Sequence, residues 1–83
     1  MKYIHTKYLE AIIYNDGDLK LSVYSIRKSS YGWSPRELQA SFQAVSLNEF
    51  TYDYVSNKVD EVYSTFPNKE IDELLTKINK ENG

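Results

Sequence analysis

Residues 8–26, YLEAIIYNDGDLKLSVYSI, predict the centre of a β-sheet, because they contain two strand-like runs separated by a turn. Residues 8–14 are rich in β-branched and aromatic side chains, which favour an extended backbone. In residues 19–26 apolar and polar side chains alternate, as they do in a strand with one buried face. Asp16 and Gly17 lie between the two runs, and glycine accepts a positive φ at no steric cost. The stretch therefore predicts an antiparallel hairpin.

The register of this hairpin is predicted from a two-residue turn at Asp16-Gly17. Such a turn would pair Tyr14 with Leu19, two residues that flank the turn. One face of the hairpin would then hold Ile12, Tyr14, Leu19, Leu21 and Val23. The other, wetter face would hold Leu9, Ala11, Ile13, Lys20, Ser22 and Tyr24. A slip of one residue would exchange the two faces, because side chains alternate along a strand.

Beyond the hairpin, the chain predicts one more strand and two helices. Residues 37–45 alternate between polar and apolar, with Leu38, Ala40, Phe42 and Ala44 on the apolar side. Ser46 and Glu49 fit a capping box, which predicts a helix over residues 47–66 that Pro67 ends. Asn68 can cap a second helix, whose apolar residues recur at helical spacing: Ile71, Leu74, Leu75 and Ile78. The predicted fold is α+β, a three-stranded antiparallel sheet followed by two C-terminal helices packed on one face, in a single domain over residues 1–83.

Composition excludes several classes of protein. The 83 residues include no Cys, so the chain cannot hold a disulfide or a cysteine-based metal site. The formal net charge of -2 argues against a protein that binds nucleic acid by neutralising phosphates. The apolar runs are too short for a membrane span, and the start of the chain has no secretory signal. We therefore expect a cytoplasmic protein that binds no membrane, no cofactor and no small-molecule substrate.

No residue pattern points to catalysis. His5 is the only histidine, and a catalytic triad would need it beside a nucleophile and an orienting acid. Two pairs of neighbouring carboxylates, Asp60-Glu61 and Asp72-Glu73, fall on the predicted helices, where neighbours point to different sides. Side chains arranged in this way face water more often than they share a proton. We therefore expect a protein that is not an enzyme and that has no metal site.

A row of acidic side chains is a candidate contact surface. In the predicted first helix, Glu49, Asp53 and Asp60 lie on one face. Such a row could imitate a phosphate backbone and bind a basic surface. The simpler interpretation is a solvated helix face, since the polar side of an amphipathic helix is routinely charged.

The aromatic residues carry the strongest prediction of function. Eight tyrosines exceed what a core of this size can satisfy, because each buried phenol needs a hydrogen-bond partner. We therefore expect several of them to be at least half exposed, as tyrosines at binding hot spots are. The predicted partner-binding residues are Tyr8, Tyr14, Tyr24, Tyr31 and Trp33, with Tyr3 as a further candidate. The predicted charged rim consists of Glu49, Asp53, Asp60, Arg27, Lys28 and Arg36. Trp33 has a second interpretation, as a lid folded over a sheet edge.

Short matches suggest a family. The chain begins Met1-Lys2-Tyr3-Ile4, has Tyr14 three residues before the turn glycine Gly17, and closes with Ile78-Asn79-Lys80-Glu81-Asn82. With its size and its order of strands followed by two helices, it resembles a small phage anti-CRISPR protein of the kind that blocks a type I surveillance complex. The resemblance implies that exposed sheet tyrosines and an acidic strand residue contact the Cas backbone subunits, with Tyr14 and Tyr8 in the tyrosine roles. The acidic position falls near Ser25, which is not acidic, so the resemblance does not specify the target.

These observations predict a non-enzymatic inhibitor that binds another protein or a ribonucleoprotein complex by steric occlusion, in the cytoplasm of a bacterial host cell. Three alternatives stay open. The first is an immunity or antitoxin-like protein that neutralises a toxin through its acidic helix. The second is a small nucleic-acid-binding module that uses the basic residues near Trp33. The third is a subunit of a homo-oligomer formed by edge-strand pairing.

Overall fold

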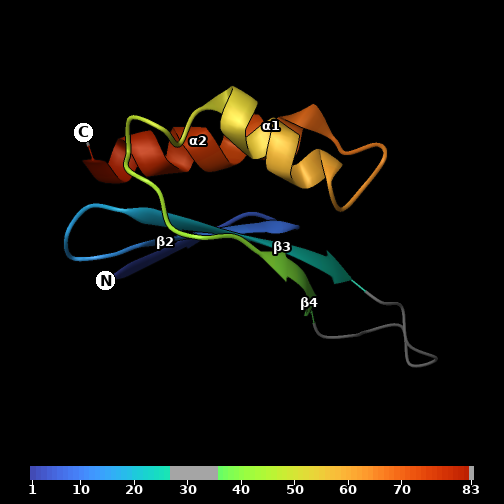
Figure 1. The fold of residues 1–83 in the computed structure, drawn as a ribbon, viewed down its shortest axis with the longest axis horizontal. Coiled ribbons are helices and arrows are strands. Elements are labelled where there is room, and N and C mark those ends of the chain that lie inside the picture. The colour runs from blue at the N-terminus through green and yellow to red at the C-terminus, as the bar shows by residue number, and fades with distance from the viewer. Residues whose placement is uncertain (27–35, 83) are drawn as a thin grey trace.

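Two helices cover one face of an antiparallel sheet, and no helix of the described residues lies on the opposite face (Figure 1). The structure is a computed structural model that describes residues 1–26 and 36–82. Its elements are β1 (Lys2–His5), β2 (Leu9–Ile13), β3 (Leu19–Ile26), β4 (Arg36–Ser41), α1 (Tyr52–Asp60) and α2 (Asn68–Asn82). The strands lie in the order β1-β2-β3-β4, and each is antiparallel to its neighbour. The predicted α+β class with two C-terminal helices is confirmed.

The prediction of three strands is wrong, because β1 adds a fourth strand at one edge. This strand is only four residues long, and its burial pattern shows Ile4 as its one buried side chain. A single buried position gives no period, so the alternation that marks longer strands is not visible in the sequence. The strand forms because Ile4 lies opposite the buried Ala11 and completes the core at that edge.

The hairpin between β2 and β3 is shifted by one residue from the predicted register. Ile13, not Tyr14, lies opposite Leu19, so the loop between the hydrogen-bonded residues Tyr14 and Asp18 has three residues rather than the predicted two. The amide of Tyr14 donates to the carbonyl of Asp18 at 2.9 Å, and the amide of Asp18 donates to Oδ1 of Asp16 at 3.0 Å. Gly17 has a φ of 93°, the left-handed region that glycine adopts without strain. The buried face therefore combines the apolar residues of both strands: Leu9, Ala11, Ile13, Leu19, Leu21 and Val23.

The core lies between this face of the sheet and the two helices (Figure 1). Helix α1 contributes Val55 and Val59, which are fully buried. Helix α2 contributes Ile71, Leu74 and Ile78, at the predicted helical spacing. Burial of one such side chain stabilises the fold by roughly 1.5–3 kcal/mol. The apolar sides of the two helices and the buried face of the sheet thus form one hydrophobic core.

A β-bulge in β4 turns one predicted core residue outward. Ala40 lies opposite Val23, but Leu38 lies opposite Tyr24, so the pairing shifts by one residue across Gln39. The predicted strand placed Leu38 on the same buried face as Ala40, and that placement is wrong. Leu38 is 53% exposed on the face that the helices do not cover. Phe42 and Val45, which follow the strand, pack against the core.

Helix α1 is shorter than the helix predicted over residues 47–66. Its N-cap is Thr51, whose side chain accepts a hydrogen bond from the amide of Tyr54. The predicted cap at Ser46 is wrong, because the Ser46 carbonyl accepts bonds from the Glu49 and Phe50 amides in a separate turn. After Asp60 the chain leaves the helix, and Tyr63 and Phe66 instead pack their rings together at the edge of the core.

Candidate protein-binding surface

The face of the sheet that the helices leave uncovered carries exposed apolar side chains beside a polar row. We call it the open face. Across it, the strand register places Tyr3 beside Ile12 and Lys20, then His5 beside Glu10, Ser22 and Ser41, then Tyr24 beside Leu38. Tyr3 is 62% exposed and Leu38 is 53% exposed. The open face is therefore amphipathic, with apolar side chains on both sides of its polar row.

One end of this sheet is rich in aromatic rings, and we call it the aromatic end. Tyr8, which directly precedes β2, lies next to Tyr24 of β3 there, because the Tyr24 amide donates to the Tyr8 carbonyl at 2.7 Å. The Tyr24 hydroxyl donates to Oε1 of Glu10 at 3.2 Å, which fixes the direction of the ring. Leu38 lies opposite Tyr24 on β4. The structure thus makes two of the predicted partner-binding tyrosines backbone neighbours, with Tyr24 beside Leu38 on the open face and the Tyr8 ring packed against Phe66.

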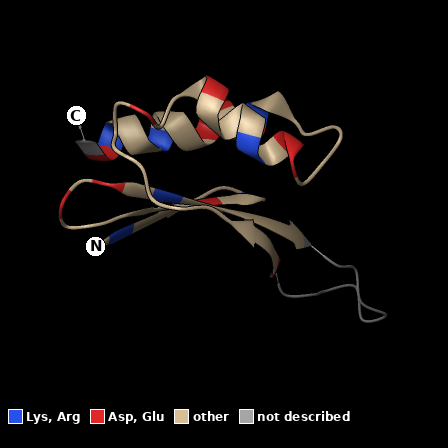
Figure 2. Ribbon diagram, viewed as in Figure 1, with Lys and Arg blue, Asp and Glu red and all other residues tan. Residues whose placement is uncertain are grey.

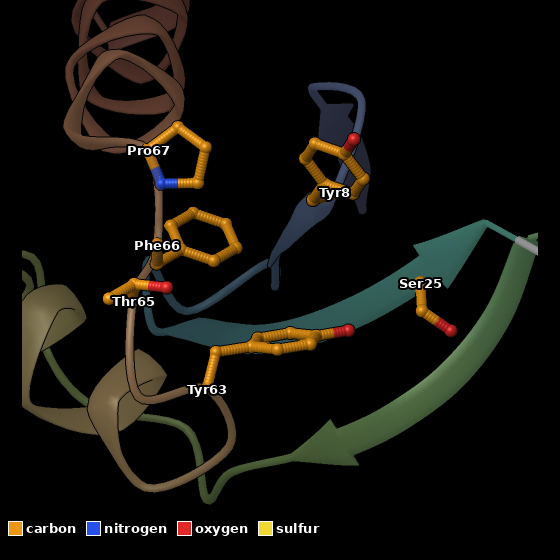
Figure 3. A pocket seen from close by; sticks show the side chains of 6 residues that line it. All are labelled: Tyr8, Ser25, Tyr63, Thr65, Phe66 and Pro67. Atoms are coloured by element: carbon orange, nitrogen blue, oxygen red, sulfur yellow. The ribbon is translucent and has the colours of Figure 1, made fainter.

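The aromatic end continues into a pocket of about 270 Å³ (Figure 3). The ring of Phe66 packs against the rings of Tyr8 and Tyr63, with centroid distances of 6.0 Å and 5.8 Å. The lining residues are Tyr8, Ser25, Tyr63, Thr65, Phe66 and Pro67. None of these six side chains carries a charge at pH 7, so the pocket combines apolar ring faces with a few hydroxyl groups. Such a lining suits an uncharged side chain better than an ion.

The side chain of Glu70 in helix α2 holds Tyr8 in position by binding the backbone amide of Tyr8. One carboxylate oxygen of Glu70, Oε1, accepts hydrogen bonds from the Thr6 hydroxyl at 2.8 Å and from the Tyr8 amide at 3.0 Å. Thr6 Oγ1 in turn accepts from the amide of Leu9 at 3.2 Å. The ammonium group of Lys7 lies 5.4 Å from the centre of the Tyr8 ring, in cation–π range. The turn between β1 and β2 is therefore tied to the first turn of α2.

The other predicted site residues lie elsewhere or outside the described residues. Tyr14 follows β2, six residues from Tyr8, which in an extended strand is about 20 Å. It therefore does not join the aromatic end. Arg27, Lys28, Tyr31 and Trp33 fall outside the described residues. Arg36 is the first residue of β4.

The predicted acidic row is not one helix face. Asp53 and Asp60 are exposed on α1, but Glu49 belongs to the turn that precedes the N-cap. Figure 2 shows acidic residues on both helices, with basic residues among them. Lys58 of α1 pairs with Glu61 at 3.7 Å. The helical layer thus has the mixed charges of a solvated surface.

The tyrosines are less exposed than the sequence predicted. Of the seven that the structure describes, none is buried, but Tyr3 alone is more than half exposed. The expectation that several are at least half exposed is therefore wrong for the described residues. For three of them the reason is ring packing, since neighbouring rings shield one another: Tyr8 with Phe66, Tyr63 with Phe66, and Tyr54 with Phe50.

The sequence analysis missed Tyr63, Phe66 and Leu38. The first two fell inside the predicted first helix, and Leu38 was placed in the core. The Phe66-Pro67 pair was used to end the predicted helix, but it does not indicate that α1 already ends at Asp60. No sequence signal marks the bulge that exposes Leu38.

Comparison with protein families, with curated proteins and with solved structures finds no match to this chain. Neither described helix combines the length and the apolar content that crossing a bilayer requires. The function must therefore be inferred from the chemistry of the surfaces described above.

Proposed function

We propose that this protein is a non-enzymatic binding protein that docks on another protein through the aromatic end of its sheet and blocks the partner's surface. The observation that carries the proposal is the exposed Leu38 opposite Tyr24, on the face of the sheet that neither described helix covers. Aromatic and large apolar side chains that project from a rigid sheet supply contact area at little entropic cost. A partner that covers them would exclude water from an apolar centre with charges around it.

Charge supports the choice of this face over the helical layer. The helices carry exposed carboxylates such as Asp53, Asp60 and Asp72 (Figure 2). At the aromatic end, the Glu10 carboxylate accepts a hydrogen bond from the hydroxyl of Tyr24, and the exposed Glu37 directly precedes Leu38 on β4. A partner that covers Tyr24 and Leu38 therefore meets one carboxylate that already has a hydrogen-bond donor, with a second one at the margin.

The resemblance to small phage anti-CRISPR proteins supplies the finer proposal. We take the partner to be a subunit of a bacterial defence complex, and steric occlusion to be the mode of inhibition. This proposal draws on the resemblance for the partner's identity and on the aromatic end for the contact. It is tested by adding the purified protein to a type I surveillance complex and measuring target DNA binding.

Capture of a partner through defined positions tests the general proposal. A photo-crosslinking amino acid at position 38 is expected to capture the partner, and the same group at position 47 is not. Leu47 is a matched control, because it is 47% exposed but belongs to the turn before α1. The identified partner is then expected to bind the Leu38→Ser and Tyr24→Ala variants at least tenfold more weakly, and Leu47→Ser as well as the unchanged protein.

Two outcomes would contradict the proposal. Equal capture at positions 38 and 47 would show that the contact is not on the open face. Capture of only a second copy of the chain, with a doubled mass in size-exclusion chromatography, would assign the face to self-association instead.

A further inference from the structure

Strand β1 presents a free backbone edge at the side of the sheet opposite β4. Its partner is β2, and no described strand lies on its other side. The amide of Thr6 donates to the carbonyl of Leu9 at 2.9 Å, so at Thr6 the backbone faces β2. Because the direction alternates along an antiparallel strand, Ile4 and Lys2 also face β2, whereas Tyr3 and His5 face outward. The outward groups are the ones that another strand would use.

Basic side chains of α2 line this edge. The ammonium group of Lys77 donates to the carbonyl of His5 at 3.0 Å. A pocket of about 290 Å³ lies between β1 and α2, lined by Tyr3, Ile4, His5, Lys77, Lys80 and Glu81. Figure 2 shows basic residues at the start of β1 and in the half of α2 that lies above it. An edge strand beside lysines favours a partner of opposite charge.

The lysines at this edge outnumber the glutamates that pair with them. Lys2 pairs with Glu81 at 3.3 Å, and Lys77 pairs with Glu73 at 3.4 Å. Lys80 makes no ion pair within the described part of the chain. In a chain with a formal net charge of -2, this edge is therefore a local basic surface.

We propose that the β1 edge binds an extended acidic segment of a partner protein by strand addition. The segment would take its backbone hydrogen bonds from the amides of Tyr3 and His5 and from the carbonyl of Tyr3. Residues of the added strand that lie opposite Ile4 would point toward α2, where Lys77 and Lys80 can pair with carboxylates. The alternate residues would lie opposite Tyr3 on the open face, where an apolar side chain packs against its ring.

The bond from Lys77 to His5 sets the selectivity of this edge. It covers the outward carbonyl of His5, which the added strand does not use, and it holds the Lys77 ammonium group at the edge, where the lysines of a basic strand would be repelled. A carboxylate of an acidic strand would give the Lys77 ammonium group a new partner. The edge therefore discriminates by charge rather than accepting any exposed strand.

Short peptides test the proposal on the purified full-length protein, without any partner from the cell. The probe is a blocked hexapeptide of alternating glutamate and valine, titrated at low salt while the backbone amide resonances are followed by NMR. We expect saturable shifts at residues 2–6 and slower amide exchange at Tyr3 and His5. The affinity is expected to fall as salt rises, because exposed charges are screened. The alternating lysine and valine peptide is expected not to bind.

Two variants separate charge from strand addition. Lys80→Glu is expected to weaken binding about fivefold, whereas Lys69→Glu is not, because Lys69 is exposed at the other end of the same helix. His5→Pro removes an outward amide without touching the bonds to β2, and is expected to abolish binding while the fold is kept. Should His5→Pro not fold, the lysine pair still tests the charge, and slower amide exchange at Tyr3 and His5 still tests strand addition.

Several results would overturn the proposal. These are the absence of saturable shifts, shifts that map away from β1, equal binding of the lysine peptide, or equal binding of a peptide with three glutamates followed by three valines. The last would show attraction of charge without strand addition. Because this surface is separate from the aromatic end, either proposal can fail while the other stands.

Discussion

The hydroxyl of Thr6 donates a 2.8 Å hydrogen bond to Glu70 Oε1 and so joins residues that lie 64 positions apart in the chain. Thr6 is only 5% exposed. The same carboxylate oxygen also accepts a hydrogen bond from the amide of Tyr8. One side chain of α2 therefore orders the turn between β1 and β2, and with it the tyrosine that lines the aromatic pocket. This bond connects the stability of the fold to the shape of its candidate surface.

Replacing Glu70 is expected to destabilise the protein. Glu70→Ala leaves the Thr6 hydroxyl and the Tyr8 amide without their acceptor, at a cost of about 1–3 kcal/mol in the free energy of unfolding. Urea denaturation followed by circular dichroism measures the change. Glu73→Ala is the matched control, because it removes an exposed ion pair on the same helix and is expected to cost less than about 0.5 kcal/mol. Equal losses for the two variants would contradict the role given to Glu70.

Two leucines on opposite faces of the sheet are expected to respond very differently to truncation. Leu21→Ala removes a fully buried side chain and is expected to cost about 2–5 kcal/mol. Leu38→Ala removes one that is 53% exposed and is expected to change stability by no more than about 0.5 kcal/mol. Thermal or urea denaturation measures both. A large loss for Leu38→Ala would show that the bulge does not turn this residue outward.

The turn between β2 and β3 depends on its glycine. Gly17 has a φ of 93°, and a Cβ there would meet no atom within 4 Å, so a substitution suffers from backbone strain and not from a clash. Gly17→Ala is expected to destabilise the protein by about 1 kcal/mol, and Gly17→Asn by less, because asparagine tolerates positive φ better. Denaturation of the two variants side by side measures the difference. Identical stabilities for the unchanged protein and the alanine variant would contradict this turn geometry.

How far the fold could be predicted depended on the length of each pattern. The start of helix α2 was predicted to within one residue, because Ile71, Leu74 and Ile78 repeat over two turns and Asn68, predicted as the cap, is the first helical residue. Strand β1 was missed, because four residues with one buried side chain show no repeat. The register of the hairpin was missed by one residue, because Asp16-Gly17 suits a two-residue turn as well as the longer one. The stronger constraint was tertiary: only the observed register puts six apolar residues on the face that meets the helices.

The sequence predicted that tyrosines contribute to the candidate site, but not how these residues are arranged. Tyr8 and Tyr24 were singled out separately, and only the strand register shows that they are neighbours. The exposure of Leu38 depends on a β-bulge, and no pattern in residues 37–45 indicates that bulge. Tyr63 and Phe66 join the site because α1 ends at Asp60, earlier than its predicted end at the proline. The roles of Tyr31 and Trp33 stay predictions, since both lie outside the described residues.

The start of α1 gives a test in which the predicted and observed structures disagree. The side chain of Thr51 accepts the amide of Tyr54 at 3.2 Å, so Thr51→Ala is expected to cost about 1 kcal/mol in the free energy of unfolding. Ser46→Ala is expected to cost less than about 0.5 kcal/mol, because Ser46 is exposed. The bonds described for Ser46 are accepted by its backbone carbonyl, which the substitution keeps. Urea denaturation of both variants, with helicity followed at 222 nm, measures the two costs. If Ser46→Ala proved the more damaging, the helix would begin at the capping box after all, and Glu49 would rejoin Asp53 on one face.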